Sequence, residues 1–240
     1  HWHIANGGTA ALAKAILDDS KADVRLGTVV KKVEQNDRGV ILRTADGHTV
    51  EARAAIFTLP TKVYPDINFK PGLSAAKRAF IDNGEMCDGA TMYMRVKKNL
   101  GNTFTFCDDP NPLNAIQTEE FNDEVGTILK ATIGRQSLID MNDQDAITAE
   151  LRKIHPGVEV TDIAPYNWVK DPFSKQGWPS YKVGWFKKYK DMAKPENRLF
   201  FAGAATADGW HAYIDGAVES GIRACREVTE KLAREDTKNG

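Results

Sequence analysis

The sequence predicts an α/β fold, and three features of its 240 residues carry that prediction. Residues 199–202 form a short apolar run typical of a buried strand, and small residues at 203–207 separate it from a helical pattern that begins near Tyr213. Residues 24–33 are rich in β-branched side chains, which favours a second strand. Between these two segments, strand-like stretches are mixed with helix-like ones, which indicates sheets with flanking helices.

The composition, net charge and cysteine spacing argue against several classes of function. With 42% hydrophobic residues, the chain can build a sizeable core and one or two domains. A net charge of -1 gives no field that would favour nucleic acid or membrane lipid, and no apolar run approaches the ~18 residues of a membrane span. Cys87, Cys107 and Cys225 show neither a metal-binding spacing nor a disulfide framework. We therefore expect no metal, no nucleic acid and no membrane span, and a soluble protein for which the cytoplasm is favoured.

The N-terminal quarter predicts a helix followed by strands. Apolar residues between 10 and 17 lie on one face of a helix, which predicts a short amphipathic segment. After the strand at 24–33 we expect a turn at 36–39, a strand at 40–44, a hairpin turn at Asp46-Gly47 and a strand at 48–57. His48 is expected at a solvent-exposed edge.

From about residue 62 to residue 195 the pattern changes to a mixture of sheet and helix. His155, next to Pro156-Gly157, fits a helix end better than a catalytic position. The charged tail, residues 231–240, is expected to fray. The segments expected here are helices at 73–81, 137–141 and 143–154, and strands at 91–96, 104–106, 126–133 and 158–168.

The segment around residue 203 is the candidate binding element. A strand, a small-residue turn and a helix N-terminus together present unpaired N–H groups and a positive helix end, which suit an anionic or electron-rich ligand. The helix carries apolar residues at helical spacing from Ala217 to Val228. From these residues alone, an ordinary turn that binds nothing remains an equal alternative.

Residues 201–225 read FAGAATADGWHAYIDGAVESGIRAC. They resemble FAGxxTAxxWxxYxDGAVxSGxRAA, the C-terminal flavin segment of the flavin-containing amine oxidases, a superfamily that includes monoamine, polyamine and L-amino acid oxidases. The resemblance implies FAD as cofactor and the C-terminal portion of a two-domain flavoprotein. Residues 1–61 and 196–240 would belong to a Rossmann-like FAD domain, and residues 62–195 would form a mixed α+β substrate domain. The positions that match cofactor-binding positions of the family are Val30, Trp168, Gly203, Ala204, Trp210, Tyr213, Ile214, Asp215 and Ala217.

The pyrophosphate-binding motif of that family is not found in this sequence. Family members open with a GxGxxG turn, whereas the nearest segment here, Asn6-Gly7-Gly8, has a different spacing. The chain also opens on His1 rather than methionine. We therefore expect this chain to be one part of a two-chain or nicked enzyme, in a hetero-oligomer with an N-terminal chain that carries GxGxxG.

Residues 168–178, WVKDPFSKQGW, resemble a second family segment. There the first tryptophan packs near the flavin, while the aromatic residues at the positions of Trp178 and Tyr213 form two walls of a cage for the amine. Each tryptophan taken singly would be read as an ordinary core residue. Monoamine oxidases link their flavin through a cysteine at the position of Gly177, so we expect noncovalent FAD.

The implied reaction is hydride transfer from a C–N bond to flavin N5, giving an imine and, with oxygen as acceptor, hydrogen peroxide. Trp178 and Tyr213 would be the catalytic residues, by holding an amine or amino acid over the flavin. Many family members also carry a lysine on the strand that corresponds to residues 89–96, and this chain has none there; Met92 or Tyr93 lies nearest. Two alternatives stay open: a flavin dehydrogenase or desaturase that uses another electron acceptor, and a noncatalytic partner subunit that keeps the fold.

Overall fold

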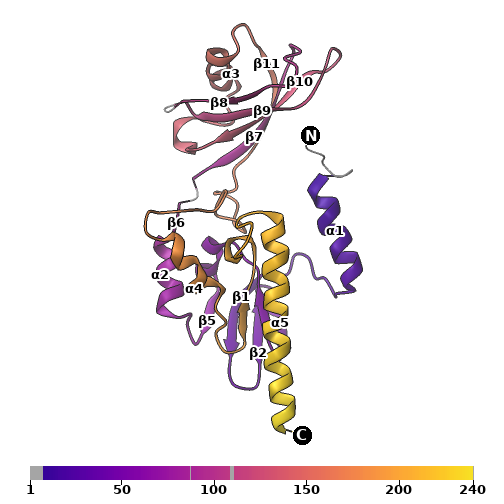
Figure 1. Ribbon diagram of the computed structural model, residues 1–240, viewed down its shortest axis with the longest axis vertical. Helices are drawn as coiled ribbons and strands as arrows, with labels where there is room; N and C mark the ends of the chain where they lie inside the picture. Colours follow the sequence, from indigo (N-terminus) through magenta and orange to yellow (C-terminus); the bar gives the residue numbers. More distant parts are fainter. Residues whose placement is uncertain (1–7, 87, 109–110, 240) are drawn as a thin grey trace.

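The computed structural model describes residues 8–86, 88–108 and 111–239, and the chain folds into an upper and a lower part (Figure 1). The upper part contains one sheet and one helix, and the lower part contains the remaining sheets and helices. Two stretches of chain join them, one before β7 and one after β11. The two parts have separate hydrophobic clusters, so each is packed around its own core. The combination of sheets with helices confirms the predicted α/β class.

The upper part is built on a five-stranded antiparallel sheet in the order β11-β7-β10-β9-β8. Side chains of β7 alternate between the two faces, and Met92, Met94 and Val96 point into the core. Helix α3, Gln144–Ile154, covers that face with Ile147 and Leu151. The strands are β7 Ala90–Val96, β8 Phe104–Phe106, β9 Leu113–Asn122, β10 Gly126–Ile133 and β11 Val160–Tyr166.

Helix α3 begins and ends where the sequence indicates. The carboxylate of Asp143 caps it by accepting hydrogen bonds from the backbone N–H groups of Asp145 and Ala146 at 3.1 and 3.0 Å. His155 is its C-terminal cap, as expected. Strand β9 was not predicted, although it lies between β10 and β8 and is the longest strand of the sheet.

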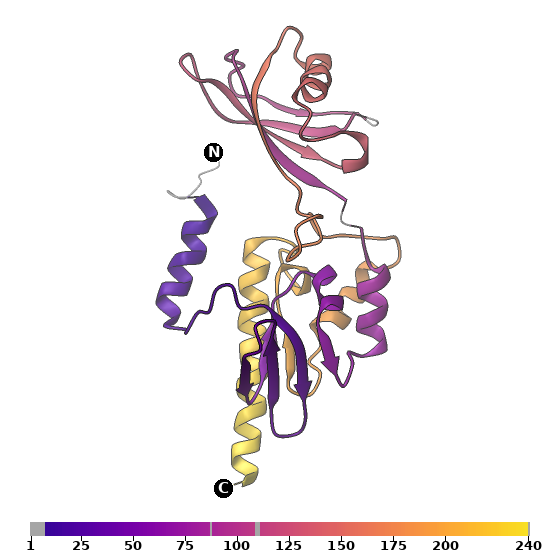
Figure 2. The ribbon, with the colours of Figure 1, turned by 180° about the vertical axis from the view of Figure 1, so that it is seen from behind.

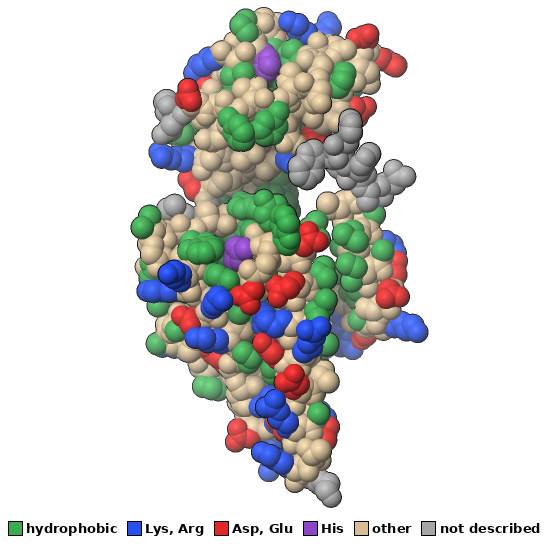
Figure 3. All heavy atoms as spheres, in the orientation of Figure 1, with side chains coloured by type: hydrophobic (Ala, Val, Ile, Leu, Met, Phe, Trp, Pro, Cys, Tyr) green, Lys and Arg blue, Asp and Glu red, His purple; other side chains and the backbone are tan. Residues whose placement is uncertain are grey.

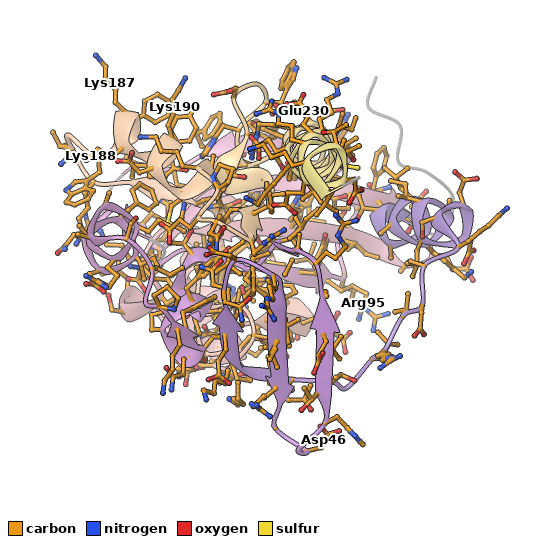
Figure 4. The ribbon with its side chains drawn as sticks, turned by 90° about the horizontal axis from the view of Figure 1, so that it is seen from below. Asp46, Arg95, Lys187, Lys188, Lys190 and Glu230 are labelled. Atoms are coloured by element: carbon orange, nitrogen blue, oxygen red, sulfur yellow. The ribbon has the colours of Figure 1, made fainter. Side chains whose placement is uncertain are left out.

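The lower part combines a four-stranded sheet with a pair of parallel strands. The sheet has the order β3-β2-β1-β5, and its β2–β3 hairpin ends in the turn at Asp46 (Figure 4). Strand β13, Leu199–Phe201, runs parallel to β4, Ala55–Phe57, and all three of its residues are buried. The other strands are β1 Val30–Gln35, β2 Val40–Thr44, β3 Thr49–Ala52 and β5 Asn68–Lys70.

Hydrogen bonds from Lys77 join two helices of the lower part. Helix α2, Ala75–Asn83, begins after the cap Ser74, and Lys77 lies in its first turn with no exposed surface. Its Nζ donates hydrogen bonds to the carbonyls of Asp191, Met192 and Lys194, at 2.6, 2.9 and 2.7 Å, at the end of helix α4, Tyr189–Ala193. Strands β6, Glu85–Met86, and β12, Ser180–Tyr181, pair nearby.

The C-terminal tail is helical rather than frayed. Helix α5 extends from Ile214–Asn239. Its last turns are fixed to the lower part by two ion pairs, Arg198 with Glu235 and Arg53 with Asp236, both at 2.6 Å. Contacts between side chains four residues apart, such as Arg234 with Glu230, add further support. The prediction of fraying was wrong because the charges of this tail have partners elsewhere in the fold.

Three other segments differ from expectation. The strand predicted at 24–33 begins only at Val30, because Gly27 adopts φ 68° and turns the chain. The strand predicted at 48–57 is divided into β3 and β4, and the helix predicted at 137–141 is a 3-10 turn, Gln136–Leu138. Strand β1 pairs antiparallel with β2 and parallel with β5, so it lies in a mixed sheet.

Helix α1, Gly8–Ser20, stands apart from the rest of the lower part, as the front and back views agree (Figures 1 and 2). It has no buried residue, and its apolar Leu12, Ile16 and Leu17 are 42–51% exposed. Hydrophobic side chains also line the side of α5 that faces it (Figure 3). Within the described ranges, no helix is long and apolar enough to cross a membrane.

The boundaries of the two cores differ from the predicted domain boundaries. Residues such as Tyr64, Phe80 and Tyr189 lie between 62 and 195, yet they pack in the same cluster as Phe57 and Phe201. The upper cluster takes its residues from 90–160. The separation between the two cores therefore falls near residues 88–89 and 167–168, and the assignment of each core to a functional domain stays a prediction.

Candidate functional site

The small-residue turn after β13 is held in place by a buried serine. Gly203 has φ 116°, a left-handed conformation that other residues rarely adopt. Ser220, on the first turns of α5, accepts a hydrogen bond from the Gly203 N–H at 2.9 Å and donates one to the Gly203 carbonyl at 3.1 Å. A short 3-10 turn, Ala204–Thr206, follows. The sequence thus places a turn of small residues beside the start of α5.

The start of α5 offers unpaired backbone donors. Within the part of the chain that the structure describes, no acceptor is found for the N–H groups of Ile214, Asp215 and Gly216, as is usual for a first helical turn. The Asp215 carboxylate is exposed and does not cap these donors. The helix end therefore keeps its positive character toward solvent.

Two cavities flank the ends of β4 and β13. The smaller, about 240 Å³, is lined by Gly203, Ala204 and Gly177 among others. The larger, about 500 Å³, is lined by Val30 and by the apolar residues around it. Thr58 and Leu59 line both cavities, so the two lie on either side of the same loop. Residues that the sequence matched to cofactor-binding positions therefore lie on both sides of this loop, with Val30 at the larger cavity and Gly203 and Ala204 at the smaller one.

The structure brings together the two predicted cage residues. The rings of Trp178 and Tyr213 have centroids 5.0 Å apart and planes inclined at 78°, and both side chains are more than half exposed. The ring of Trp210 lies 5.9 Å from that of Tyr213. A ligand sandwiched between two rings needs them about 7 Å apart, which is twice the ~3.5 Å contact distance. In this structure the two rings touch edge to face, so the slot expected between them is closed.

Trp168 belongs to a different group of side chains. It follows β11, and its ring lies 4.3 Å from that of Tyr166. The Tyr166 hydroxyl donates a hydrogen bond of 2.6 Å to Asp171, which lowers the pKa of that carboxyl and raises the pKa of the tyrosine. Trp168 does not line either cavity. Its predicted contact with the flavin stays a prediction.

Gly177 has no room for a side chain. A Cβ added there would lie 2.2 Å from the carbonyl oxygen of Gly89. A cysteine at this position would therefore require a shift of the backbone. The close approach of these two glycines fits the expectation that no covalent link to the flavin forms at residue 177.

The strand expected to carry a lysine is β7, and none of its residues is a lysine. Met92 is fully buried in the core, whereas Tyr93 lies on the opposite face, away from α3. The lysine nearest in register is Lys130 of β10, which pairs with Tyr93 and lies 4.0 Å from Glu119.

Two further side chains of this region, His211 and Tyr181, were not predicted from the sequence. These two side chains are hydrogen-bonded through Nε2 and the hydroxyl, and the rings of Phe186 and Tyr189 surround the imidazole at 6.4 and 4.9 Å. The run of aromatic residues at 181, 185, 186 and 189 was the available signal. Gln176 was missed as well; it is buried beside the smaller cavity and accepts a hydrogen bond from the Lys62 N–H at 3.1 Å.

Comparisons with known proteins agree with this geometry. The sequence profile of the flavin containing amine oxidoreductases matches residues 3–229. A nicotine dehydrogenase from Pseudomonas putida is 48% identical over 233 residues, which cover 97% of this chain and 48% of that protein. A pseudooxynicotine dehydrogenase from a Pseudomonas species is 37% identical over 230 residues, 94% of this chain and 45% of that protein. The chain thus spans about half the length of these relatives.

The fold is also similar to that of solved structures. A variant of putrescine oxidase superposes with a TM-score of 0.82 at 16% sequence identity, covering 94% of this chain and 53% of that one. At this low identity the likeness establishes the fold alone. It indicates that the upper and lower parts together form one portion of that fold.

Proposed function

This chain belongs to the family of flavin-containing amine oxidoreductases, and from that membership we propose that it forms part of an FAD-dependent enzyme that oxidises the C–N bond of an amine. The observation that carries the proposal is the pairing of Trp178 with Tyr213 beside the Gly203 turn and the donors of α5. When bound, FAD would accept a hydride from the amine carbon and leave an imine for hydrolysis.

The residues present fit noncovalent FAD. Val30 lines the larger cavity and would face the adenine end, while Gly203 and Ala204 line the smaller cavity and would face the ring system. The N–H groups of Ile214 and Asp215 would donate hydrogen bonds to the electron-rich edge of that ring system. Trp210 and Ala217 lie beside these donors, in the turn before α5 and in its first turn.

Trp178 and Tyr213 would bind the amine itself. Their faces supply apolar area and a quadrupole that attracts a partly positive nitrogen, and together they exclude water from the reacting carbon. Because the rings touch edge to face in this structure, binding would require one of them to turn or move. In this proposal residues 62–195, which include the upper sheet and Trp178, form the substrate domain, and residues 1–61 and 196–240 belong to the FAD domain.

We propose an amine with a ring system as substrate, rather than an amino acid. The support comes from the two relatives described above, whose names contain nicotine and pseudooxynicotine. Both are named dehydrogenases, and β7 of this chain carries no lysine. These two observations favour an electron acceptor other than oxygen, and oxidase action is the alternative.

A further segment of polypeptide would complete the site. The β4–β13 pair has only two parallel strands, whereas parallel sheets are usually larger and covered on both faces. Leu26, Ile56 and Ile222 are 90%, 43% and 49% exposed, and α1 buries nothing. We propose that a segment with a GxGxxG turn packs against this surface and supplies the pyrophosphate site.

The test is anaerobic reduction of the flavin in the complete protein by a ring-bearing amine, followed by its absorbance. Trp178→Ala and Tyr213→Ala should each slow this reduction while FAD stays bound. Exposure of the reduced enzyme to oxygen, or to an artificial electron acceptor, then separates oxidase from dehydrogenase action. Reduction at the same rate in both variants would reassign the two rings to ordinary packing.

A further inference from the structure

Two segments of the lower part meet at two separate contacts. One segment runs from Trp178 to β12, and the other is the turn between the 3-10 turn Ala204–Thr206 and helix α5. Trp178 meets Tyr213 through their rings, 5.0 Å apart. Tyr181 lies three residues after Trp178, and His211 lies two residues before Tyr213. The hydroxyl of Tyr181 is hydrogen-bonded to Nε2 of His211. The aromatic pair and this hydrogen bond therefore join the same two segments.

The turn that carries Tyr213 has an uncommon backbone. Trp210 and Ala212 have φ values of 46° and 69°, in the left-handed region, although neither is a glycine. Such a conformation is unfavourable for a residue with a side chain and persists only where neighbouring contacts hold it. His211 lies between these two residues, so its side chain is well placed to supply such contacts.

Both nitrogens of His211 are engaged. Nδ1 lies 3.2 Å from the carbonyl oxygen of Ala207, within the turn itself, and Nε2 contacts the Tyr181 hydroxyl of the other segment. With the proton on Nδ1, the imidazole donates to the carbonyl and accepts from the tyrosine. The ring of Tyr181 is in turn packed against Phe80 and Tyr189 of the lower core, at 5.8 and 6.4 Å. Lys187, Lys188 and Lys190, which follow further along the chain, project outward (Figure 4).

We propose that His211 is a positioning residue, which through Tyr181 fixes the turn of Trp210 and Ala212 and so sets the separation of the Trp178 and Tyr213 rings. This inference rests on the proposed function only where it assigns amine binding to the space between the two rings. The positioning of the turn by His211 rests on the contacts alone. Loss of the Tyr181 hydroxyl removes the link between the segments but keeps the aromatic packing.

The experiment compares Tyr181→Phe with a matched variant, Tyr189→Phe, in the complete flavin-loaded protein. Both changes delete one hydroxyl near the same imidazole, but the Tyr189 hydroxyl donates to Asp208 at 3.1 Å and not to His211. The first readout is hydrogen exchange of the Ala212 and Tyr213 amides, which bond to the carbonyls of Ala204 and Trp210, each at 3.0 Å. The second is KM and kcat for the amine.

We expect Tyr181→Phe to speed exchange of both amides and to raise KM by about 3- to 10-fold, the effect of one hydrogen bond, with a smaller change in kcat. Tyr189→Phe should change each by less than about 2-fold. A second pair of variants supports the assignment. His211→Gln keeps an amide near the position of Nε2 and should retain much of the wild-type exchange protection and KM. His211→Asn, whose amide is nearer the position of Nδ1, should not.

Equal exchange rates in Tyr181→Phe and Tyr189→Phe would overturn the proposal, as would an unchanged KM together with unchanged exchange. Trp178→Ala separates this inference from the proposed function. If that variant binds the amine normally while Tyr181→Phe still loosens the turn, the aromatic pair is not the amine site, yet His211 still positions the turn. If Trp178→Ala raises KM and Tyr181→Phe changes nothing, the site stands and the positioning role is wrong.

Discussion

Replacement of Gly216 by alanine should disrupt the turn before α5, because the helix start leaves no room for a methyl group. A Cβ at this position would lie 2.3 Å from the Trp210 carbonyl oxygen, 2.9 Å from the Ala207 Cβ and 3.0 Å from the Gly209 carbonyl oxygen. The Trp210 carbonyl accepts the Tyr213 N–H at 3.0 Å, so its retreat also moves Tyr213. Gly216→Ala should therefore lower the stability of the fold and at the same time displace the Tyr213 ring relative to Trp178.

The magnitude follows from two opposing effects. Overpacking costs about 1–3 kcal/mol, whereas a change from glycine to alanine in a helix gains up to about 1 kcal/mol. We expect a net loss of roughly 1–2 kcal/mol in the free energy of unfolding of Gly216→Ala. Gly221, five residues along the same helix, has no atom within 4 Å of its added Cβ, so Gly221→Ala should gain up to about 1 kcal/mol.

The assay is thermal unfolding of both variants at equal flavin loading, since a bound ligand shifts the midpoint. At about 2–4 °C per kcal/mol for a chain of this size, Gly216→Ala should lower Tm by about 2–8 °C and Gly221→Ala should raise it by up to about 4 °C. If Gly216→Ala proves as stable as Gly221→Ala, the close packing of the turn on the helix start is incorrect, and with it the argument that this packing places Tyr213.

Other predictions concern the helix start and the buried lysine. Ala217→Leu should raise the FAD dissociation constant far more than Asp215→Asn, because it crowds the donors of α5, whereas the Asp215 carboxylate makes no contact with them; equal constants for wild type and Ala217→Leu would count against the helix end as a flavin site. Lys77→Met should lower the free energy of unfolding by about 2–4 kcal/mol, since it leaves three carbonyls without a donor, as urea denaturation would measure. Burial lowers the pKa of Lys77 to about 8 from 10.5. The unfolded chain then binds more protons between these values, so wild-type stability should rise with pH across that window relative to Lys77→Met, and parallel pH profiles would refute the shift.

The elements that the sequence predicted well have a local cause. The apolar run of β13, the small residues at Gly203 and the helical spacing of α5 are each encoded by neighbouring residues, and the structure places them as expected. The cap Asp143 and the end of α3 at His155 follow from the same kind of local signal. These are also the features that position the candidate site.

The features that were missed depend on residues far apart in the chain. The bond between Tyr181 and His211 joins segments thirty residues apart, and no periodicity indicates it. Strand β9 was hidden by the polar residues 117–120, although β10 pairs with Gln117, Thr118 and Glu120. On the other side of β9, β8 pairs with residues 115–117. The edge-to-face contact of Trp178 with Tyr213 is a further case, since a motif indicates which rings meet but not their angle.

The parallel strands explain why the binding features gather at one edge. Strands β4 and β13 run in the same direction, so their carboxyl ends lie side by side. Strand β4 leads to Thr58 and Leu59, which line both cavities, and β13 leads to Gly203 and the start of α5. In open parallel sheets, ligands bind at the carboxyl ends of the strands, where successive loops diverge. Any strand added parallel to this pair would end at the same edge, so the loop that follows it would lie there as well.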